Sequence, residues 1–312
     1  MEIPLFIDFE SKNGIHEHLE LAKQRGLIYP LYTKYSFFEN FLFSRVPLFL
    51  QKNINCWFPM KIRWGEWINN IDSHDNVVVT ANYHTIPLVK YLSKNFPDLN
   101  IHVFYFNPIA KDVPLQYFQN YHCKIWSFDK EDCNKYGLNY NNQFVVSENY
   151  EDKVKEIKHD IVFVGADKGR LQKILEIEQL LKTKGINTYF HIVSTNGEAK
   201  LSNYNYKEYL SYSEIVDLEA NAKAILDFVQ DGQSGQTIRP LEAKFLRKKL
   251  ITNNTLIKEE PYYSGDNIFI LGEDDFENLP NFIDNNYNNA FEIHPKYEIK
   301  TWLMNFISSD LG

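Results

Sequence analysis

Hydrophobic and polar positions alternate along the first half of the chain in the order strand, helix, strand. Short apolar runs rich in β-branched and aromatic residues predict strands, and apolar residues recurring every three or four positions predict helices. The predicted strands cover residues 3–7, 27–32, 77–80, 101–106 and 124–128, and the predicted helices cover 15–24 and 86–94. This order predicts a parallel sheet built from β-α-β units.

The same alternation starts again at residue 160, after a charged segment, 148–158, that has no convincing apolar face. The predicted strands are 160–164, 188–193, 224–229 and 249–252, and the predicted helices are 170–182, 214–221 and 237–247. The expected fold is therefore α/β, with two Rossmann-like domains facing across a cleft. We expect one domain at 1–150, a second at 151–295 and a last helix at 296–312 that packs back on the first domain.

Composition and charge exclude several classes of function. A length of 312 residues is enough for two domains, and a formal net charge of −8 argues against a nucleic-acid partner. The three cysteines form no CxxC pair, which favours a reducing compartment. The acidic start, MEIPLFIDFE, is unlike a secretory signal, and no run approaches the ~18 apolar residues of a membrane span. We expect a cytoplasmic protein.

An aromatic segment at 35–50 has the length of an interfacial helix. Its one basic residue is Arg45, whereas helices that lie on membranes usually carry a basic face. We favour a segment that is packed or that faces the acceptor, and keep a peripheral contact with the inner face of the plasma membrane as an alternative.

The loop and helix that follow the predicted strand 224–229 carry the most informative chemistry. Glycines in the loop allow close backbone approach, Thr237 is placed to cap the helix, and a proline suits its first turn. Free amides and the positive end of the helix dipole favour a phosphate there, and a carboxylate on this helix can accept hydrogen bonds from ribose hydroxyls. The candidate donor-binding residues are Gln233, Ser234, Gly235, Gln236, Thr237, Arg239 and Glu242. Alternatively, Glu242 is an ordinary glutamate that complements the dipole of its own helix.

The segment TIRPLEAKFLRKKLITNN, residues 237–254, resembles the donor-site helix of GT-B glycosyltransferases of bacterial surface polysaccharide (lipopolysaccharide or capsule) pathways. The likeness is clearest over 224–254, weaker over 160–193, and limited to the β-α-β pattern in the first half. It implies that Glu242 binds the nucleotide ribose and that the preceding loop meets the pyrophosphate and the sugar. Many retaining members have a second glutamate where this chain has Ser234, so the resemblance leaves retaining and inverting chemistry open.

A second strand-to-helix loop contains Gly165, Lys168 and Arg170. Two cations there suit the charge of a departing nucleoside diphosphate, although both side chains are as readily explained as solvated surface residues. The stretch 204–213, with tyrosines at near-helical spacing that include Tyr212, is a weaker candidate for the wall against which the base stacks. The acidic runs 129–132 and 273–275 look like solvated turns rather than a metal-binding Asp-x-Asp, so we expect a metal-independent reaction with no cofactor beyond the donor.

Catalytic candidates follow the predicted strands of the first half, because open α/β sheets bind ligands at the carboxyl ends of their strands. This rule nominates Asp8 and Glu10 after the first strand and His84 after 77–80. Any of the three could deprotonate an acceptor hydroxyl in an inverting enzyme. In a retaining enzyme, donor oxygens can take the proton.

The expected function is transfer of a hexose from a nucleotide-sugar, with a UDP-sugar favoured, to a hydroxyl of a glycan or glycolipid acceptor. The domain at 1–150 is then the acceptor-side domain, and the domain at 151–295 is the nucleotide-sugar-binding domain. Two alternatives share the bilobal architecture. One is a sugar-nucleotide epimerase of the non-hydrolysing type, and the other is a sugar-binding protein without catalysis, which the absence of a signal peptide disfavours.

Overall fold

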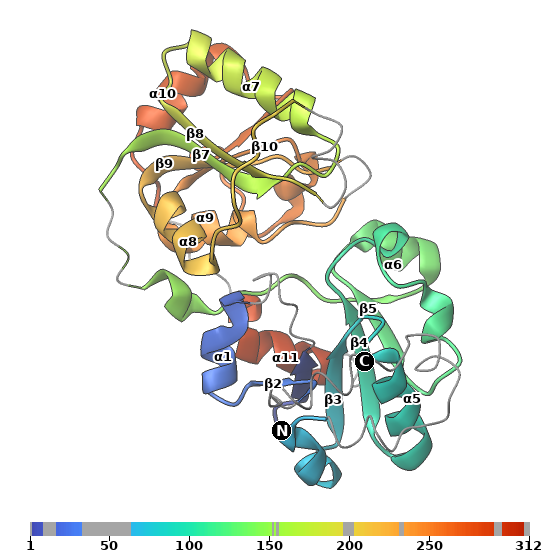
Figure 1. The fold of residues 1–312 in the computed structure, drawn as a ribbon. Helices are drawn as coiled ribbons and strands as arrows, with labels where there is room; N and C mark the ends of the chain where they lie inside the picture. The colour runs from blue at the N-terminus through green and yellow to red at the C-terminus, as the bar shows by residue number, and fades with distance from the viewer. Residues whose placement is uncertain are drawn as a thin grey trace. The chain divides into compact units, whose positions relative to one another are not determined.

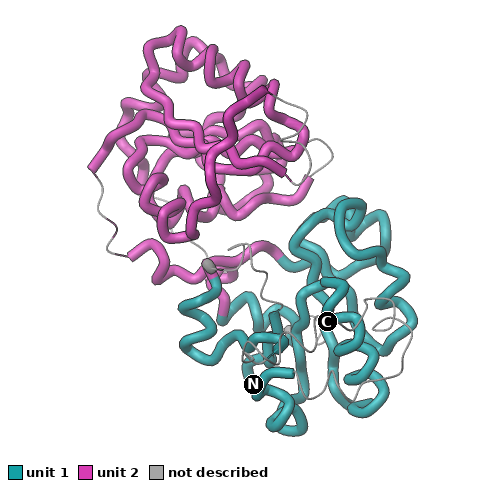
Figure 2. Tube along the Cα trace, viewed as in Figure 1, with its two compact units in different colours: residues 1–12, 19–141, 300–312 teal, residues 13–18, 142–299 magenta. Residues whose placement is uncertain are grey.

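A computed structural model describes residues 2–8, 17–32, 64–151, 153, 156–195, 203–230, 234–289 and 295–308. The candidates Glu10 and Gln233, and the aromatic segment 35–50, lie outside these ranges. Two compact units make up the chain (Figure 2). Unit 1 comprises Met1–Lys12, Leu19–Asn141 and Lys300–Gly312, and unit 2 comprises Asn13–His18 and Asn142–Ile299, whereas the sequence placed the boundary after residue 150.

The first unit is built on a six-stranded parallel sheet in the order β2-β1-β3-β4-β5-β6 (Figure 1). Its strands are β1 (Leu5–Asp8), β2 (Ile28–Pro30), β3 (Asn76–Thr80), β4 (Asn100–Tyr105), β5 (Lys124–Ser127) and β6 (Asn139–Tyr140). Its α-helices include α1 (Glu20–Gln24), α5 (Ile86–Asn95), α6 (Lys130–Tyr136) and α11 (Ile299–Ser308). Every residue of β1, β3 and β4 is buried except Asn76 and Asn100, which begin β3 and β4, because helices cover both faces of the sheet.

Alternate residues of the first sheet pack against different helices. Leu5 and Ile7 share a hydrophobic core with Leu88 of α5. The side chain between them in sequence, Phe6, instead lies 5.5 Å, centroid to centroid, from the ring of Trp302 in α11. The last helix therefore belongs to the first unit's core, although it is the most distant element in the sequence.

The second unit is built on a five-stranded parallel sheet in the order β11-β10-β9-β7-β8. Its strands are β7 (His159–Ala166), β8 (Thr188–Val193), β9 (Ala222–Asp227), β10 (Lys249–Thr252) and β11 (Ile268–Ile270). Its α-helices include α7 (Leu171–Thr183), α8 (Tyr212–Ala220), α9 (Arg239–Leu246) and α10 (Leu279–Asp284). Helices α7 and α10 cover one face of the sheet, and α8 and α9 cover the other (Figure 1).

Short 3-10 helices connect these elements. They are η1 (Glu17–Leu19), η2 (Glu66–Ser73), η3 (Ile109–Lys111), η4 (Leu115–Tyr117), η5 (Ser147–Tyr150), η7 (Thr255–Glu259), η8 (Phe276–Asn278) and η9 (Pro295–Tyr297). No helix in the described ranges is long and apolar enough to cross a membrane.

Each sheet has one point at which the strand order reverses. In the first sheet, β1 leads to β2 on one side and β3 lies on its other side, and in the second sheet β7 is flanked in the same way by β8 and β9. Open α/β sheets bind ligands outside the carboxyl ends of the strands at such switch points. The predicted α/β fold of two Rossmann-like domains is confirmed. Its topology makes the carboxyl ends of β1 and β3, and of β7 and β9, the expected ligand-binding edges.

The tyrosine-rich stretch differs from its expected form. Residues 203–211 run as irregular chain, and a helix begins only at Tyr212. Ser211 accepts a hydrogen bond from the amide of Glu214, and the Glu214 side chain accepts one from the Ser211 amide. This capping box starts the helix there, because it satisfies two amides that a longer helix would bond internally.

Candidate functional site

A buried aspartate marks the switch point of the second sheet. Asp227 is the last residue of β9 and is 4% exposed. Its carboxylate accepts hydrogen bonds from the hydroxyls of Thr237, at 2.9 Å, and Thr252, at 3.3 Å. Burial raises the pKa of Asp227, while these hydroxyls and the nearby guanidinium of Arg170 oppose the rise. Asp227 thereby links Thr237 to the ends of β9 and β10.

The loop after β7 is a tight turn held by its own backbone and by its neighbours. Lys168 and Gly169 both have left-handed backbone angles, with φ of 50° and 76°. The amide of Lys168 donates to the hydroxyl of Thr195 at 2.7 Å. Asp167 accepts from the amides of Arg170 and Leu171, so its carboxylate caps the start of α7. The exposed side chain of Lys168 therefore projects from a fixed backbone.

Arg170 brings a guanidinium to the same strand ends. It lies over the ring of Phe163, 5.6 Å from the ring centroid, and donates from Nη2 to the carbonyl of Ala166 at 3.2 Å. Its Nε is buried and has no hydrogen-bond partner among the described residues. A side chain at Gly165 would come within 3.3 Å of Nη2, so glycine leaves the space that the guanidinium occupies. Burial lowers the pKa of Arg170, and Asp227 partly restores it.

Glu242 lies at the centre of a buried hydrogen-bond network on the other side of β9. It is fully buried, and its Oε1 accepts from the hydroxyl of Tyr212 at 2.7 Å. Its Oε2 accepts from Arg239, which also donates to Glu219 Oε1 at 2.6 Å and to the carbonyl of Val164 at 3.2 Å. The Tyr212 hydroxyl is 2.7 Å from that of Tyr150. One guanidinium is thus shared by two buried carboxylates.

This burial corrects the orientation that the sequence led us to expect. We expected the carboxylate of Glu242 and the guanidinium of Arg239 to face a ligand, and both are engaged inside the protein. The hydroxyl of Tyr212, expected near the base, points into the same network. A residue in the first turn of a helix can face the sheet or the solvent, and here α9 turns Glu242 toward the sheet. Its burial favours a supporting role for Glu242 over the ribose contact that the resemblance implied.

Glu219, at the same network, is a buried carboxylate that the sequence analysis missed. Its Oε2 makes no hydrogen bond within the described part of the chain. Burial raises the pKa of Glu219 well above its usual value, Arg239 lowers it, and the negative charge of Glu242 raises it further. The network contains two carboxyl groups and one guanidinium, so its burial costs more free energy than that of a matched ion pair.

The first turn of α9 offers fewer free amides than expected. The amide of Arg239 donates to the Thr237 hydroxyl at 3.2 Å, and position 240 is a proline. The amides of Leu241 and Glu242 both donate to the carbonyl of Ile238, at 3.0 and 3.1 Å. A ligand phosphate would therefore meet the loop that precedes the helix rather than the helix itself.

That loop is described from Ser234 onward. Asn254, after β10, donates to the carbonyl of Ser234 at 3.3 Å, and Gly235 is buried behind it. Gln236 has a buried Oε1 with no partner among the described residues. Because a buried amide oxygen normally has a donor, Gln236 is a polar group on this loop that a ligand or a water could satisfy.

The two described catalytic candidates, at the switch point of the first sheet, differ in their burial. Asp8, at the end of β1, is fully buried and accepts from the Thr80 hydroxyl at 2.7 Å across to the end of β3. His84 follows β3 and is exposed, with its amide bonded to the side chain of Asn82 at 2.9 Å. Asp8 is therefore placed to fix the ends of the two strands, and His84 is the candidate that a substrate can reach.

Exposed tyrosines lie at strand ends in both units. Tyr83 is 52% exposed and Tyr117 is 37% exposed, and their rings contact each other at 5.8 Å and 72°. In the second unit, Tyr209 is 62% exposed and donates to the carbonyl of Ser194, just after β8, at 2.8 Å. Exposed rings fixed at a ligand-binding edge are suited to stacking on a sugar or a base. The strand-end rule alone would have nominated Tyr83.

Both acidic runs considered for metal binding act as structural caps. Asp129 accepts from the amides of Glu131 and Asp132 at the start of α6, and Asp275 accepts from the amide of Glu277. In the described ranges, no group of three or more His, Cys, Asp or Glu side chains is arranged to hold a metal ion.

Comparison with known proteins identifies the class of fold. No protein-family model matches the chain, and no curated protein matches it either. Among solved structures, the lipopolysaccharide outer core galactosyltransferase WaaB in its apo form matches with a TM-score of 0.52 and 11% identity, over 99% of each chain. The UDP-GlcNAc 2-epimerase from Methanocaldococcus jannaschii matches with a TM-score of 0.49 and 14% identity, over 99% of this chain and 100% of that chain. The likeness to WaaB shows a GT-B-like fold.

Proposed function

We propose that this protein is a metal-independent glycosyltransferase that moves a hexose from a nucleotide-sugar, with a UDP-sugar favoured, to a hydroxyl of a glycan or glycolipid. The observation that carries the proposal is the proximity of Arg170 to Asp227 at the switch point of the second sheet, where Gln236 directly precedes Thr237, which donates to Asp227. A cation with an unused donor, beside a loop with an unused acceptor, is the chemistry that binds a polar phosphorylated ligand. The GT-B-like fold is consistent with a sugar donor.

In the proposed donor complex, each described group has a separate task. Lys168 and Arg170 offset the negative charge that develops on the leaving nucleoside diphosphate, which lowers the barrier to cleaving the bond between the sugar and the phosphate. Backbone and side-chain groups of 234–237 orient the phosphates and the sugar. The exposed ring of Tyr209 stacks on the base. Glu242 accepts a hydrogen bond from Arg239 and so holds the start of α9, next to residues 234–237, in place.

The first domain is proposed to bind the acceptor. Tyr83 and Tyr117 provide two contiguous ring surfaces for a sugar, and His84 is the next residue in the chain after Tyr83. His84 would take the proton of the acceptor hydroxyl in an inverting reaction. In a retaining reaction it would position that hydroxyl. We propose that the acceptor belongs to a bacterial surface polysaccharide and that the reaction takes place in the cytoplasm, in line with the resemblance of residues 237–254.

A ligand screen tests the donor assignment. Unfolding temperature is measured with UDP, GDP, CMP and free hexoses, for the unchanged protein and for Arg170→Ala. A ligand at 100 times its dissociation constant stabilises the folded state by about 2.7 kcal/mol, so a binding nucleotide gives a clear shift. We expect a shift with UDP that Arg170→Ala abolishes.

The control is Lys173→Ala, which removes the same charge from an exposed position one turn further along α7. It should keep the UDP shift. Equal loss in both variants would show a general effect of charge and contradict a site at Arg170. A shift with free hexose but with no nucleotide would favour the sugar-binding alternative instead.

A further inference from the structure

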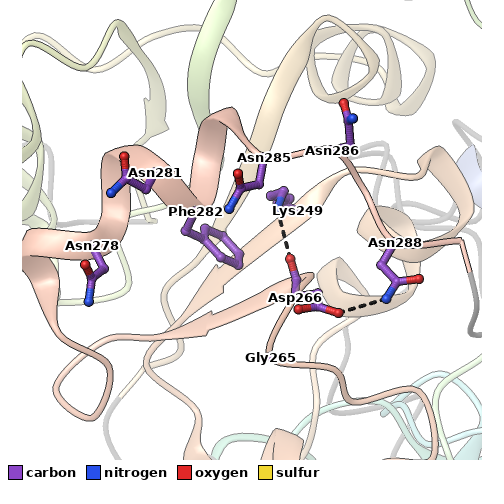
Figure 3. A pocket seen from close by; sticks show the side chains of 9 residues that line it. All are labelled: Lys249, Gly265, Asp266, Asn278, Asn281, Phe282, Asn285, Asn286 and Asn288. Carbon is purple, nitrogen blue, oxygen red and sulfur yellow. Dashed lines mark hydrogen bonds between the residues drawn. The ribbon is translucent and has the colours of Figure 1, made fainter.

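A cavity lies in the second unit, where Lys249, Asp266 and several asparagines face a common space (Figure 3). Its volume is about 520 Å³, within the size range of small-molecule pockets. Lys249 is the first residue of β10, and Asp266 precedes β11, so the cavity lies at the amino ends of these strands. The cavity is lined by Lys249, Gly265, Asp266, Asn278, Asn281, Phe282, Asn285, Asn286 and Asn288.

Asparagine amides dominate the lining. Five of the nine lining residues are asparagines, and they come from η8, α10 and the chain that follows α10. An amide carries both an acceptor oxygen and two donor hydrogens, which matches a sugar hydroxyl that donates and accepts at once. Asn281 and Asn285 are exposed, and within the described ranges their side chains make no hydrogen bond to the protein. Their amides are available to a ligand.

A buried lysine provides a second, independent indication of a ligand. Lys249 is 3% exposed, and its Nζ donates to the backbone carbonyl of Asp266 at 2.9 Å. The same Nζ lies 4.4 Å from the ring centroid of Phe282. An ammonium group has three donor hydrogens, and this carbonyl is its one hydrogen-bond acceptor among the described residues. Burying a donor without an acceptor costs free energy, and a ligand oxygen in the cavity would accept a hydrogen bond from this ammonium group.

The charges of the lining residues favour an uncharged ligand over an anionic one. Lys249 is the one cationic residue of the lining and Asp266 the one anionic residue, so the lining has no formal net charge. The carboxylate of Asp266 accepts from Asn288 at 2.8 Å and would repel an anion. A phosphate or nucleotide site needs an excess of positive charge, which this cavity lacks. Hydroxyl groups can instead donate to the carboxylate and accept from the lysine.

We propose that this cavity binds a neutral oligosaccharide. The proposal goes beyond the transferase activity, because binding here uses no residue of the donor or acceptor strand ends. Lys249 and Thr252 begin and end β10, and Thr252 is at the edge that carries Asp227. The four-residue strand separates the two edges by about 10 Å.

Calorimetric titration of the full chain tests the proposal with defined probes. The neutral probes are maltohexaose, cellohexaose and mannohexaose at millimolar concentration, and the acidic comparison is hexagalacturonate. We expect saturable binding of at least one neutral hexasaccharide, unchanged when the titration is repeated in saturating UDP. The double variant Asn281→Ala/Asn285→Ala removes two hydrogen-bonding amides and should weaken binding about tenfold.

The matched control is Asn120→Ala, which removes an exposed asparagine amide from the first unit. It should bind as the unchanged protein does. The double variant should keep the unfolding temperature of the unchanged protein, because Asn281 and Asn285 show no internal hydrogen bond of their side chains in the described ranges. The proposal is overturned by three results: no binding of any neutral hexasaccharide, equal binding by the double variant, or competition by UDP.

Discussion

Replacing Glu242 with alanine distinguishes a carboxylate that holds the fold from one that holds the ligand. The side chain is fully buried and accepts hydrogen bonds from Tyr212 and Arg239. In the variant both donors lose this acceptor. A ligand-facing carboxylate would instead affect nucleotide affinity and leave stability nearly unchanged, so the two roles predict opposite patterns.

The magnitude follows from the contacts that remain. A hydrogen bond to a charged group contributes about 1.5–3 kcal/mol, so two such bonds contribute about 3–6 kcal/mol. Arg239 keeps Glu219, and Tyr212 keeps Tyr150, which places the expected loss at the lower end. We expect the free energy of unfolding to fall by about 3 kcal/mol, the lower end of that range.

Urea denaturation measures the loss, and calorimetry with UDP on the folded variant measures the affinity. The control is Glu176→Ala, which removes an exposed glutamate on α7 and should change stability by less than about 0.5 kcal/mol. We expect the UDP affinity of the folded Glu242→Ala protein to stay within about threefold of the unchanged value, or about 0.7 kcal/mol. Unchanged stability together with a loss of affinity of about tenfold or more would refute the supporting role and restore the ribose contact.

Three further outcomes follow from the same geometry. Glu219 has a raised pKa in the folded protein, so its protonated form stabilises the fold at low pH and this contribution is lost as pH rises above about 4.3 through the folded-state pKa. Glu219→Gln should therefore gain thermal stability over the unchanged protein as pH rises, and a difference that is constant between pH 4 and pH 8 would contradict the assignment. Tyr209→Ala should raise the KM for the donor with little change in stability, whereas Tyr209→Phe should keep the stacking ring, and equal KM values in all three proteins would exclude stacking. Turnover should persist in EDTA because Lys168 and Arg170 offset the diphosphate charge, and a complete loss that manganese restores would show that a metal is required.

The elements that the sequence predicted best are short, buried strands. Thr188–Val193 and Lys249–Thr252 match the predicted ranges at both ends, because apolar runs between polar turns read clearly as strands of a parallel sheet. The strands β6 and β11, of two and three residues, were not predicted, whereas the equally short β2 was found within the longer predicted range 27–32.

The sequence predicted the loops of the candidate site but not the orientation of their side chains. The loops after β7 and β9 follow from strand ends and polar residues that the sequence displays, and the structure brings Arg170 and Asp227 together there. The inward turn of Glu242 was not predictable, because the face that α9 presents to the sheet is set by tertiary packing. Glu219 joins Arg239 from twenty positions away in the chain, a contact that no local pattern encodes.

The most direct test of the central claim is product analysis with a labelled sugar donor. UDP-hexoses carrying a carbon-13 label in the sugar are incubated with the protein and a set of glycan and glycolipid acceptors. The products are separated, and their molecular masses are measured by mass spectrometry. The account predicts release of UDP together with a labelled hexose on an acceptor, and a strong reduction of both products by Arg170→Ala. Conversion of the donor to an epimer, with the sugar still attached to UDP and no labelled acceptor formed, would contradict the account and identify an epimerase.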